Sequence, residues 1–160
     1  MADFIWIKET VPSNLKVKQV YGIVFSEDKR ILLRIDDNKY KLTGGKPEDK
    51  EKYEETLERE YIEELNVELD KIHYLGYLLV EENGKKYAQV RMIAKIKNIG
   101  SKKTDIDNGK VYSRKLVKLD NVKKYLNYSD EAGNSMIDDA IDMANKKYKF
   151  IGLNVNEESV

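Results

Sequence analysis

The segment from residue 50 to residue 65 constrains the fold most, because its apolar side chains recur every four residues. They are Tyr53, Leu57, Tyr61 and Leu65. An α-helix turns about 100° per residue, so these side chains share one face of a helix and should pack against a sheet. β-rich runs precede and follow this helix. We therefore expect an α/β fold in which a mixed sheet carries helices on both faces.

Two β-rich runs, residues 17–25 and 30–35, precede the helix. Four polar residues at 26–29 separate them, and this pattern predicts a hairpin turn. Three shorter elements are expected next: a turn at 36–38, an extended piece at 40–42 and a glycine loop at 43–47. The leader, residues 1–16, could pair as an edge strand or stay loose.

A second hairpin is expected after the helix. Residues 72–80 and 87–96 are β-rich and flank Asn83-Gly84, a pair that favours a tight turn between antiparallel strands. The later elements expected are a polar loop at 98–110, a last strand at 111–117, a short helix at 119–126 and a helix at 134–147.

A chain of this length suits one compact domain, and nothing in the sequence divides it. We interpret residues 1–160 as a single domain in which the 1–16 leader and the 153–160 tail are peripheral, and we expect the tail to fray. The start lacks the basic region and long apolar run of a signal peptide, and no stretch is apolar enough to span a membrane.

The charge balance limits the partners. With 29 basic and 29 acidic residues, the net charge of zero gives no general attraction to nucleic acid or to an anionic membrane. We expect a small-molecule partner, no long nucleic acid, no membrane, and a monomer or homodimer. The absence of cysteine excludes disulfides, thiolate zinc sites and cysteine nucleophiles, and it suits the reducing cytoplasm, where we expect the protein.

An acidic face accompanies the apolar face of the 50–65 helix. Glu60, Glu63 and Glu64 are spaced i, i+3 and i+4, so their carboxylates crowd together. Each like-charged pair destabilises an isolated helix by roughly 0.2–0.5 kcal/mol, and a hard cation such as magnesium reverses that balance. A solvated helix face would explain the three glutamates alone. The glycine pair before the helix and the single Arg59 at fixed distances favour a metal site instead.

Residues 44–67 read GGKPEDKEKYEETLEREYIEELNV and resemble the Nudix box. The matching residues are Gly45, Glu51, Arg59, Glu60, Ile62, Glu63, Glu64, Leu65 and Val67. Two positions depart from the pattern. Tyr61 replaces an aliphatic residue, which costs little if it packs on the sheet. Asn66 replaces the glycine that closes the helix, and Asn is the next-best residue for a left-handed cap.

The resemblance implies roles for individual residues. The implied ligands of magnesium or manganese are Glu60, Glu63, Glu64 and the carbonyl of Gly44. Glu51 would pair with Arg59 and fix the loop against the helix, and these two complete the implied catalytic set. Lys46 could reach a substrate phosphate or could be a solvated loop lysine.

The resemblance also implies a Nudix-like α/β/α sandwich and a metal-dependent pyrophosphohydrolase that cleaves a phosphoanhydride in a nucleoside diphosphate derivative. The main alternative is a Nudix-fold protein that binds nucleotides without hydrolysing them, against which the intact acidic set argues. An isoprenoid diphosphate isomerase is disfavoured by the missing cysteine. An RNA 5′-end pyrophosphohydrolase is weakened by the zero net charge. An acidic structural helix without enzymatic role is disfavoured by the matched spacing.

The substrate and the general base stay open at this point. No signature of NADH, coenzyme A or ADP-ribose hydrolases is evident, which leaves nucleoside triphosphates, including oxidised ones, and other small nucleoside diphosphate derivatives. Some relatives use a box glutamate as the base, and others use a carboxylate on the loop before the last strand. In that loop Asp105 and Asp107 are candidates by proximity only, and a solvated polar loop explains them better.

Overall fold

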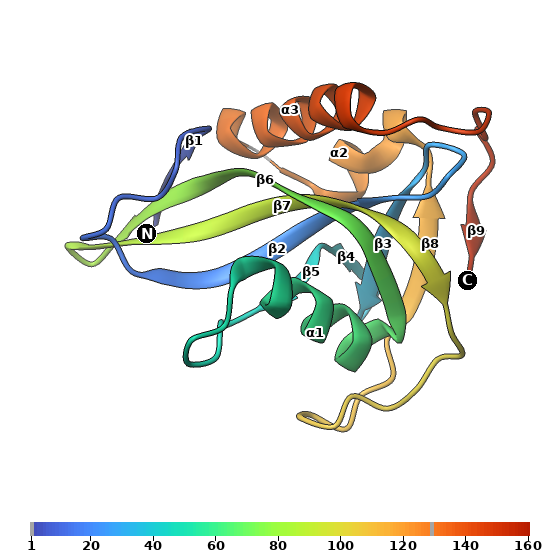
Figure 1. Ribbon diagram of the computed structural model, residues 1–160, viewed down its shortest axis with the longest axis horizontal. Coiled ribbons are helices and arrows are strands. Elements are labelled where there is room, and N and C mark those ends of the chain that lie inside the picture. Colours follow the sequence, from blue (N-terminus) through green and yellow to red (C-terminus); the bar gives the residue numbers. More distant parts are fainter. Residues whose placement is uncertain (1, 129) are drawn as a thin grey trace.

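A computed structural model describes residues 2–128 and 130–160. Their strands form one mixed sheet in the order β1-β6-β7-β2-β3-β8-β9, with β4 added to β3 and β5 added to β2 (Figure 1). The strands are β1 (Asp3–Ile7), β2 (Val17–Phe25), β3 (Ile31–Asp36), β4 (Lys39–Lys41), β5 (Thr43–Gly45), β6 (Val67–Glu82), β7 (Lys85–Ile99), β8 (Ser113–Val117) and β9 (Glu158–Ser159). The helices are α1 (Tyr53–Leu65), the short 3-10 helix η1 (Leu119–Asn121), α2 (Val122–Leu126) and α3 (Glu131–Lys147). Strands β2 and β7 pair in parallel, and the other described pairs are antiparallel.

Helices cover both faces of the sheet, as the sequence predicts (Figure 1). Helix α1 buries Leu57, Tyr61 and Leu65 against one face, while Tyr53 is half-buried at its start. Helix α3 covers the other face with an apolar stripe at helical spacing, namely Met136, Ile137, Ala140 and Ala144. No helix in residues 2–128 and 130–160 is long and apolar enough to cross a membrane.

The long β6–β7 hairpin turns at Asn83-Gly84, where both residues have positive φ angles of 53° and 74°. This confirms the predicted tight turn. Strand β6 begins earlier than predicted, because it continues through a polar stretch that interrupts the apolar alternation. Register irregularities between Asp70 and His73, with Lys71 at φ 51°, let the strand keep pairing across that stretch.

The predicted glycine loop at 43–47 is wrong in part, because Thr43–Gly45 is strand β5 and pairs antiparallel with β2. Close packing explains this. A Cβ on Gly44 would lie 2.0 Å from the carbonyl oxygen of Val20, so no larger residue could bring β5 so near to β2. The glycine is needed for the approach of two backbones and not for a turn.

The prediction of a frayed tail is also wrong. Strand β9 pairs with β8, and Val160 exchanges hydrogen bonds with Arg114 through its amide and its carbonyl. Glu158 lies 2.8 Å from the buried guanidinium of Arg30. The tail is ordered because it supplies partners to arginines that the sheet buries. At the other terminus β1 pairs with β6, so the edge-strand alternative for the leader is correct.

Candidate active site

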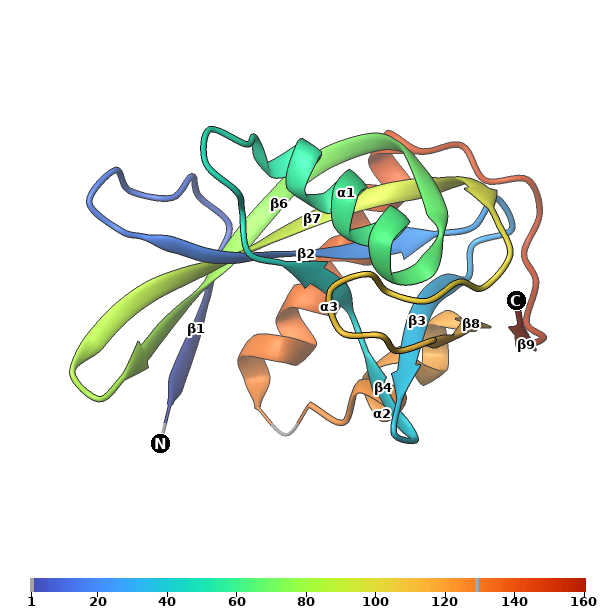
Figure 2. The same cartoon turned by 90° about the horizontal axis from the view of Figure 1, so that it is seen from below.

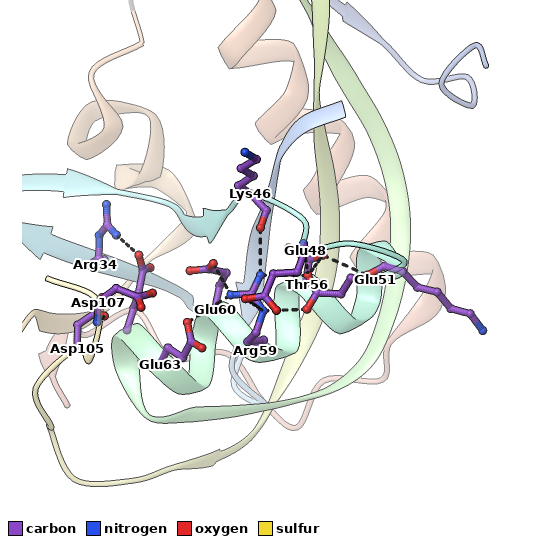
Figure 3. A network of polar contacts seen from close by, with 12 residues as sticks. Arg34, Lys46, Glu48, Glu51, Thr56, Arg59, Glu60, Glu63, Asp105 and Asp107 are labelled. Atoms are coloured by element: carbon purple, nitrogen blue, oxygen red, sulfur yellow. Dashed lines mark hydrogen bonds and ion pairs between the residues drawn. The ribbon is translucent and has the colours of Figure 1, made fainter. Parts of the chain in front are cut away.

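Arg59 holds the loop before α1 against the helix. Its Nε and Nη2 donate to the two carboxylate oxygens of Glu51 at 2.8 and 3.0 Å, and Nη2 also donates to the Lys46 carbonyl at 3.0 Å (Figure 3). The Thr56 hydroxyl adds a 2.6 Å hydrogen bond to Glu51. The Arg59 hydrogen bonds lower the pKa of Glu51 to about 2. The predicted Glu51–Arg59 brace is therefore present.

The remaining guanidinium nitrogen of Arg59, Nη1, faces the acidic side of α1. Its Nη1 lies 2.8 Å from Glu60 Oε1 and 3.3 Å from Glu63 Oε2. The Glu60 carboxylate rests on the backbone of Gly45, where an added Cβ would approach its carboxyl carbon to 2.5 Å. Burial raises the pKa of Glu60, and the charges of Glu63 and Asp107 act in the same direction against Arg59. Gly45 thus makes room for a partly desolvated carboxylate.

Glu64, one helical turn beyond Glu60, is bound from the sheet. Its Oε1 lies 3.0 Å from Nη1 of Arg34 on β3, and both side chains are 12% exposed. Burial raises the pKa of Glu64 to about 7 in spite of Arg34. Its Oε2 and the Arg34 Nε find no hydrogen-bond partner among the described residues. Buried polar atoms of native proteins are usually paired, so this oxygen is a free acceptor that calls for an explanation.

The loop over residues 100–112 brings two further carboxylates to this face (Figure 3). Asp105 is buried and accepts a 2.9 Å hydrogen bond from the Asp107 amide, so the solvated-loop interpretation is wrong for Asp105. Its charge contributes to the raised pKa of Glu64. Asp107 lines a cavity of about 460 Å³ together with Glu60 and Arg59.

Lys46 lies at the same cavity but does not point at the carboxylates. Its side chain extends away from Arg59 while its carbonyl faces the guanidinium (Figure 3). Gly44 lies on β5 next to Gly45, and the Glu60 carboxylate packs against the backbone of Gly45. The structure therefore gathers the predicted residues along β5, α1 and the loop between them, and their roles in catalysis stay predictions.

The acidic residues fit a hard divalent cation by their chemistry. In residues 2–128 and 130–160, no three carboxylate or imidazole side chains converge closely enough to hold an ion as they are arranged here. Arg59 draws Glu60 and Glu63 to one side, and Arg34 draws Glu64 to the other. The donors are nevertheless carboxylate oxygens, the ligands that magnesium prefers, and one of them is buried without a partner.

Sequence reasoning missed Arg34. The sequence did contain a signal for it: Arg34 interrupts the apolar residues of β3 and lies on the same side of the strand as Leu32, which packs in the core beneath α1. An inward-facing arginine in a strand needs an acidic or carbonyl partner. The acidic helix supplies one, but the sequence alone does not show which glutamate.

Comparisons with known proteins agree with this geometry. The family model of the NUDIX domain matches residues 16–131. The Bacillus subtilis pyrophosphohydrolase BsRppH is 25% identical, with a TM-score of 0.54 over 61% of this chain and 62% of that chain, so the chain spans about three fifths of its length. An Ap4A hydrolase of C. elegans has a TM-score of 0.62 at 16% identity, covering 81% of this chain and 98% of that chain.

A NUDIX hydrolase from Nitrosomonas europaea has a TM-score of 0.59 at 18% identity, covering 83% of this chain and 92% of that chain. Among curated proteins no match was found. The expected Nudix resemblance and the mixed α/β fold are confirmed by these matches. Since the family model spans well over half of the sequence, the chain belongs to the NUDIX domain family.

Proposed function

We propose that the protein is a metal-dependent pyrophosphohydrolase that cleaves a phosphoanhydride in a nucleoside diphosphate derivative, either a nucleoside triphosphate or a nucleoside diphosphate linked to another group. One observation carries the proposal. The acidic face of α1 is braced by Arg59, borders a cavity of about 460 Å³ and keeps a buried Glu64 oxygen without a partner.

Glu60, Glu63 and Glu64, with the Gly44 carbonyl, would hold magnesium or manganese. When bound, such an ion neutralises phosphoryl oxygens and lowers the pKa of a water molecule. The chain itself orients the carboxylates. Arg59 and Arg34 hold them from opposite sides at 2.8 to 3.3 Å, and Gly45 leaves room for Glu60.

The relatives support the type of linkage. The Bacillus subtilis protein is named a pyrophosphohydrolase, and the C. elegans protein is named for hydrolysis of Ap4A. Both names support a phosphoanhydride as the bond that this chain cleaves, without selecting one nucleotide. The cytoplasmic location and the small-molecule partner expected from the sequence stay part of the proposal.

Two sources of the general base are compatible with the geometry. A glutamate of the acidic face could take the proton of the attacking water, or a carboxylate of the 100–112 loop could do so. Asp107 supports the second source, because it lines the same cavity as Glu60. Replacement of Asp107 by Asn tests this residue as the base, since the glutamates of the acidic face stay in place.

The test is a screen for phosphate or pyrophosphate release over a nucleotide panel, with magnesium, with manganese and with excess EDTA. Wild type is compared with Glu63→Gln and with Glu58→Gln, an exposed position on the same helix that serves as a matched control. We expect activity that needs metal, a loss of about 10²- to 10⁴-fold in Glu63→Gln, and wild-type turnover in Glu58→Gln.

The stability of Glu63→Gln without metal completes the test. Glu and Gln have similar helix propensities, and the partly exposed Arg59–Glu63 pair at 3.3 Å contributes little, so the melting temperature should hold nearly level. Full activity in EDTA, or equal turnover in wild type and Glu63→Gln, would overturn the assignment of the acidic face. Tight nucleotide binding without any hydrolysis would favour the non-catalytic alternative.

A further inference from the structure

A second cavity, of about 360 Å³, lies where strands β2 and β3 diverge. These strands pair only at Phe25 and Ile31, so the sheet opens towards β4 and β5 (Figure 2). The charged residues that line the cavity are Arg34, Lys41 and Arg91, and no carboxylate of the described residues lines it. Its electrostatic character is therefore cationic, in contrast to the acidic face of α1.

Arg91 is the exceptional residue of this cavity. It lies on β7 beside Tyr21 of β2, its guanidinium is 4.8 Å from the centre of the Tyr21 ring, and it is only 5% exposed. Its Nε has no hydrogen-bond partner among the described residues. Its other nitrogens make only long contacts of 3.4 to 3.5 Å with Gln89 and the Val90 carbonyl, besides a contact with the Tyr128 hydroxyl.

The other cations of the cavity are already engaged. Arg34 is bound to Glu64 at 3.0 Å, and the half-exposed Lys41 lies 3.7 Å from Asp36. An acidic residue to consider for Arg91 is Asp130, because both line a smaller cavity of about 280 Å³. Asp130 makes no ion pair with Arg91 within 4.0 Å and instead caps the start of α3 through the Gly133 amide. Arg91 thus keeps its capacity to bind an anion.

A buried arginine without an acidic partner is costly, and such residues are rare unless they are paired. The planar guanidinium matches a phosphate group through two parallel hydrogen bonds. The tyrosine hydroxyls at positions 21, 40 and 128 add neutral donors around the same space. This combination of groups suits a phosphate better than a nucleobase or an apolar group.

Arg34 connects the cavity with the proposed catalytic face, because it lines the cavity and also binds Glu64. Tyr21 lies between the two regions as well. Burial raises the pKa of Tyr21, and the charges of both Arg91 and Arg34 act against this shift. Arg34 thus places the cationic cavity next to the Glu64 carboxylate, one of the proposed metal ligands.

Resting on the proposed function, we propose that this cavity binds a phosphate of the substrate other than the two joined by the cleaved linkage, and that Arg91 is the residue that selects it. The preferred substrate class is then compounds with at least three phosphates, such as nucleoside triphosphates. Nucleoside diphosphates linked to an uncharged sugar lack the third phosphate and should be poorer substrates.

The first experiment measures binding without metal. Inorganic tripolyphosphate is titrated in excess EDTA by calorimetry into wild type, Arg91→Met, Arg91→Lys and the control Lys97→Gln, an exposed lysine of the same strand. We expect binding to wild type and Lys97→Gln, and a loss of about 10- to 100-fold in Arg91→Met, as for other hydrogen bonds to charged groups. Arg91→Met should also melt at the same or a higher temperature, because an unpaired buried charge is removed.

Arg91→Lys keeps the charge but not the fork of two donors, so its binding should fall between wild type and Arg91→Met. If Arg91→Met does not fold, the tripolyphosphate affinity of Arg91→Lys tests the role of Arg91. Tripolyphosphate binding that is unchanged in both Arg91 variants, or equally reduced in Lys97→Gln, would overturn the inference. Absence of binding to wild type would overturn it too.

The second experiment separates this inference from the proposed function. With magnesium, the Arg91 variants should raise KM for a nucleoside triphosphate and leave KM for the corresponding nucleoside diphosphate sugar unchanged. Glu63→Gln should still bind tripolyphosphate in EDTA as wild type does. If wild type binds tripolyphosphate through Arg91 but hydrolyses no nucleotide, only the proposed function fails. If it hydrolyses nucleotides and the Arg91 variants match it for both substrates, only the inference fails.

Discussion

Replacement of Arg59 by alanine tests the brace between the loop and helix α1. Arg59 makes two short hydrogen bonds to Glu51, one to Glu60 and one to the Lys46 carbonyl. Its side chain is 20% exposed and that of Glu51 is 12% exposed. After the substitution, Glu51 would lie near the other carboxylates without its counter-charge.

The magnitude follows from the exposure of the pair and from the pKa of Glu51. A depression from 4.5 to about 2 corresponds to about 3.5 kcal/mol at about 1.4 kcal/mol per pH unit, and this is an upper limit for Arg59 because hydrogen bonds at Glu48 and Thr56 also lower the pKa of Glu51. Solvent at the loop screens the pair and reduces this figure. Exposed pairs contribute about 0–1 kcal/mol, whereas breaking a buried pair costs about 3–5 kcal/mol. For this half-buried pair we expect Arg59→Ala to lower the free energy of unfolding by about 2 kcal/mol.

Urea unfolding at neutral pH measures the loss, and amide hydrogen exchange of residues 46–51 reports on the loop. The double variant Glu51→Ala/Arg59→Ala should recover part of the stability, because it removes the uncompensated carboxylate. Catalysis should weaken as well, since Glu60 loses its 2.8 Å contact. Unchanged turnover together with unchanged exchange in the loop would refute the brace.

Two further predictions concern the same elements. Because the folded-state pKa of Glu51 is depressed, its contribution to stability is complete above pH 4.5 and is lost as the pH falls towards about 2. The free energy of unfolding of Glu51→Gln should therefore fall less than that of wild type between pH 5 and 2. Parallel curves of free energy against pH would contradict this. Gly45→Ala should lower activity strongly while the fold survives, because the new Cβ meets the movable Glu60 carboxylate at 2.5 Å. Gly44→Ala should instead unfold more easily, because its Cβ meets the Val20 carbonyl at 2.0 Å. Equal stabilities of the two variants in thermal melts would contradict the packing argument.

Local spacing was enough to predict α1 and its two faces. The apolar period of four fixed the buried side, and Asn66 closes the helix with φ 54° and ψ 45°, as its cap position predicts. The Glu51–Arg59 pair was also predictable, since the seven residues between them form only a turn and the start of the helix. Such features depend on a few neighbouring residues, so they can be predicted from the local sequence.

Features that depend on distant pairing were not predictable in the same way. The contact of Glu64 with Arg34 joins α1 to β3 across the fold, and the burial of Asp105 depends on where the 100–112 loop lies. The strand conformation of Gly44 follows from its approach to β2 and not from its own preference. In each case the deciding neighbour lies far away in the sequence, and the local pattern is compatible with several partners.

The arginines of the sheet show how strongly burial selects for partners. Arg30 is bound by Asp28 and by Glu158 of the tail, Arg114 donates to three carbonyls, and Arg34 binds Glu64. The fold therefore brings even a distant terminal segment to satisfy buried guanidinium groups. Arg91 is as buried as Arg30 and Arg114 but has only long contacts and a contact with the Tyr128 hydroxyl in the described residues. If Arg91 served the fold alone, an apolar residue of similar size would do so at lower cost, because the desolvation of its charge is not offset within the chain. Its burial beside a cationic cavity is explained when the missing partner is an anion that the protein binds.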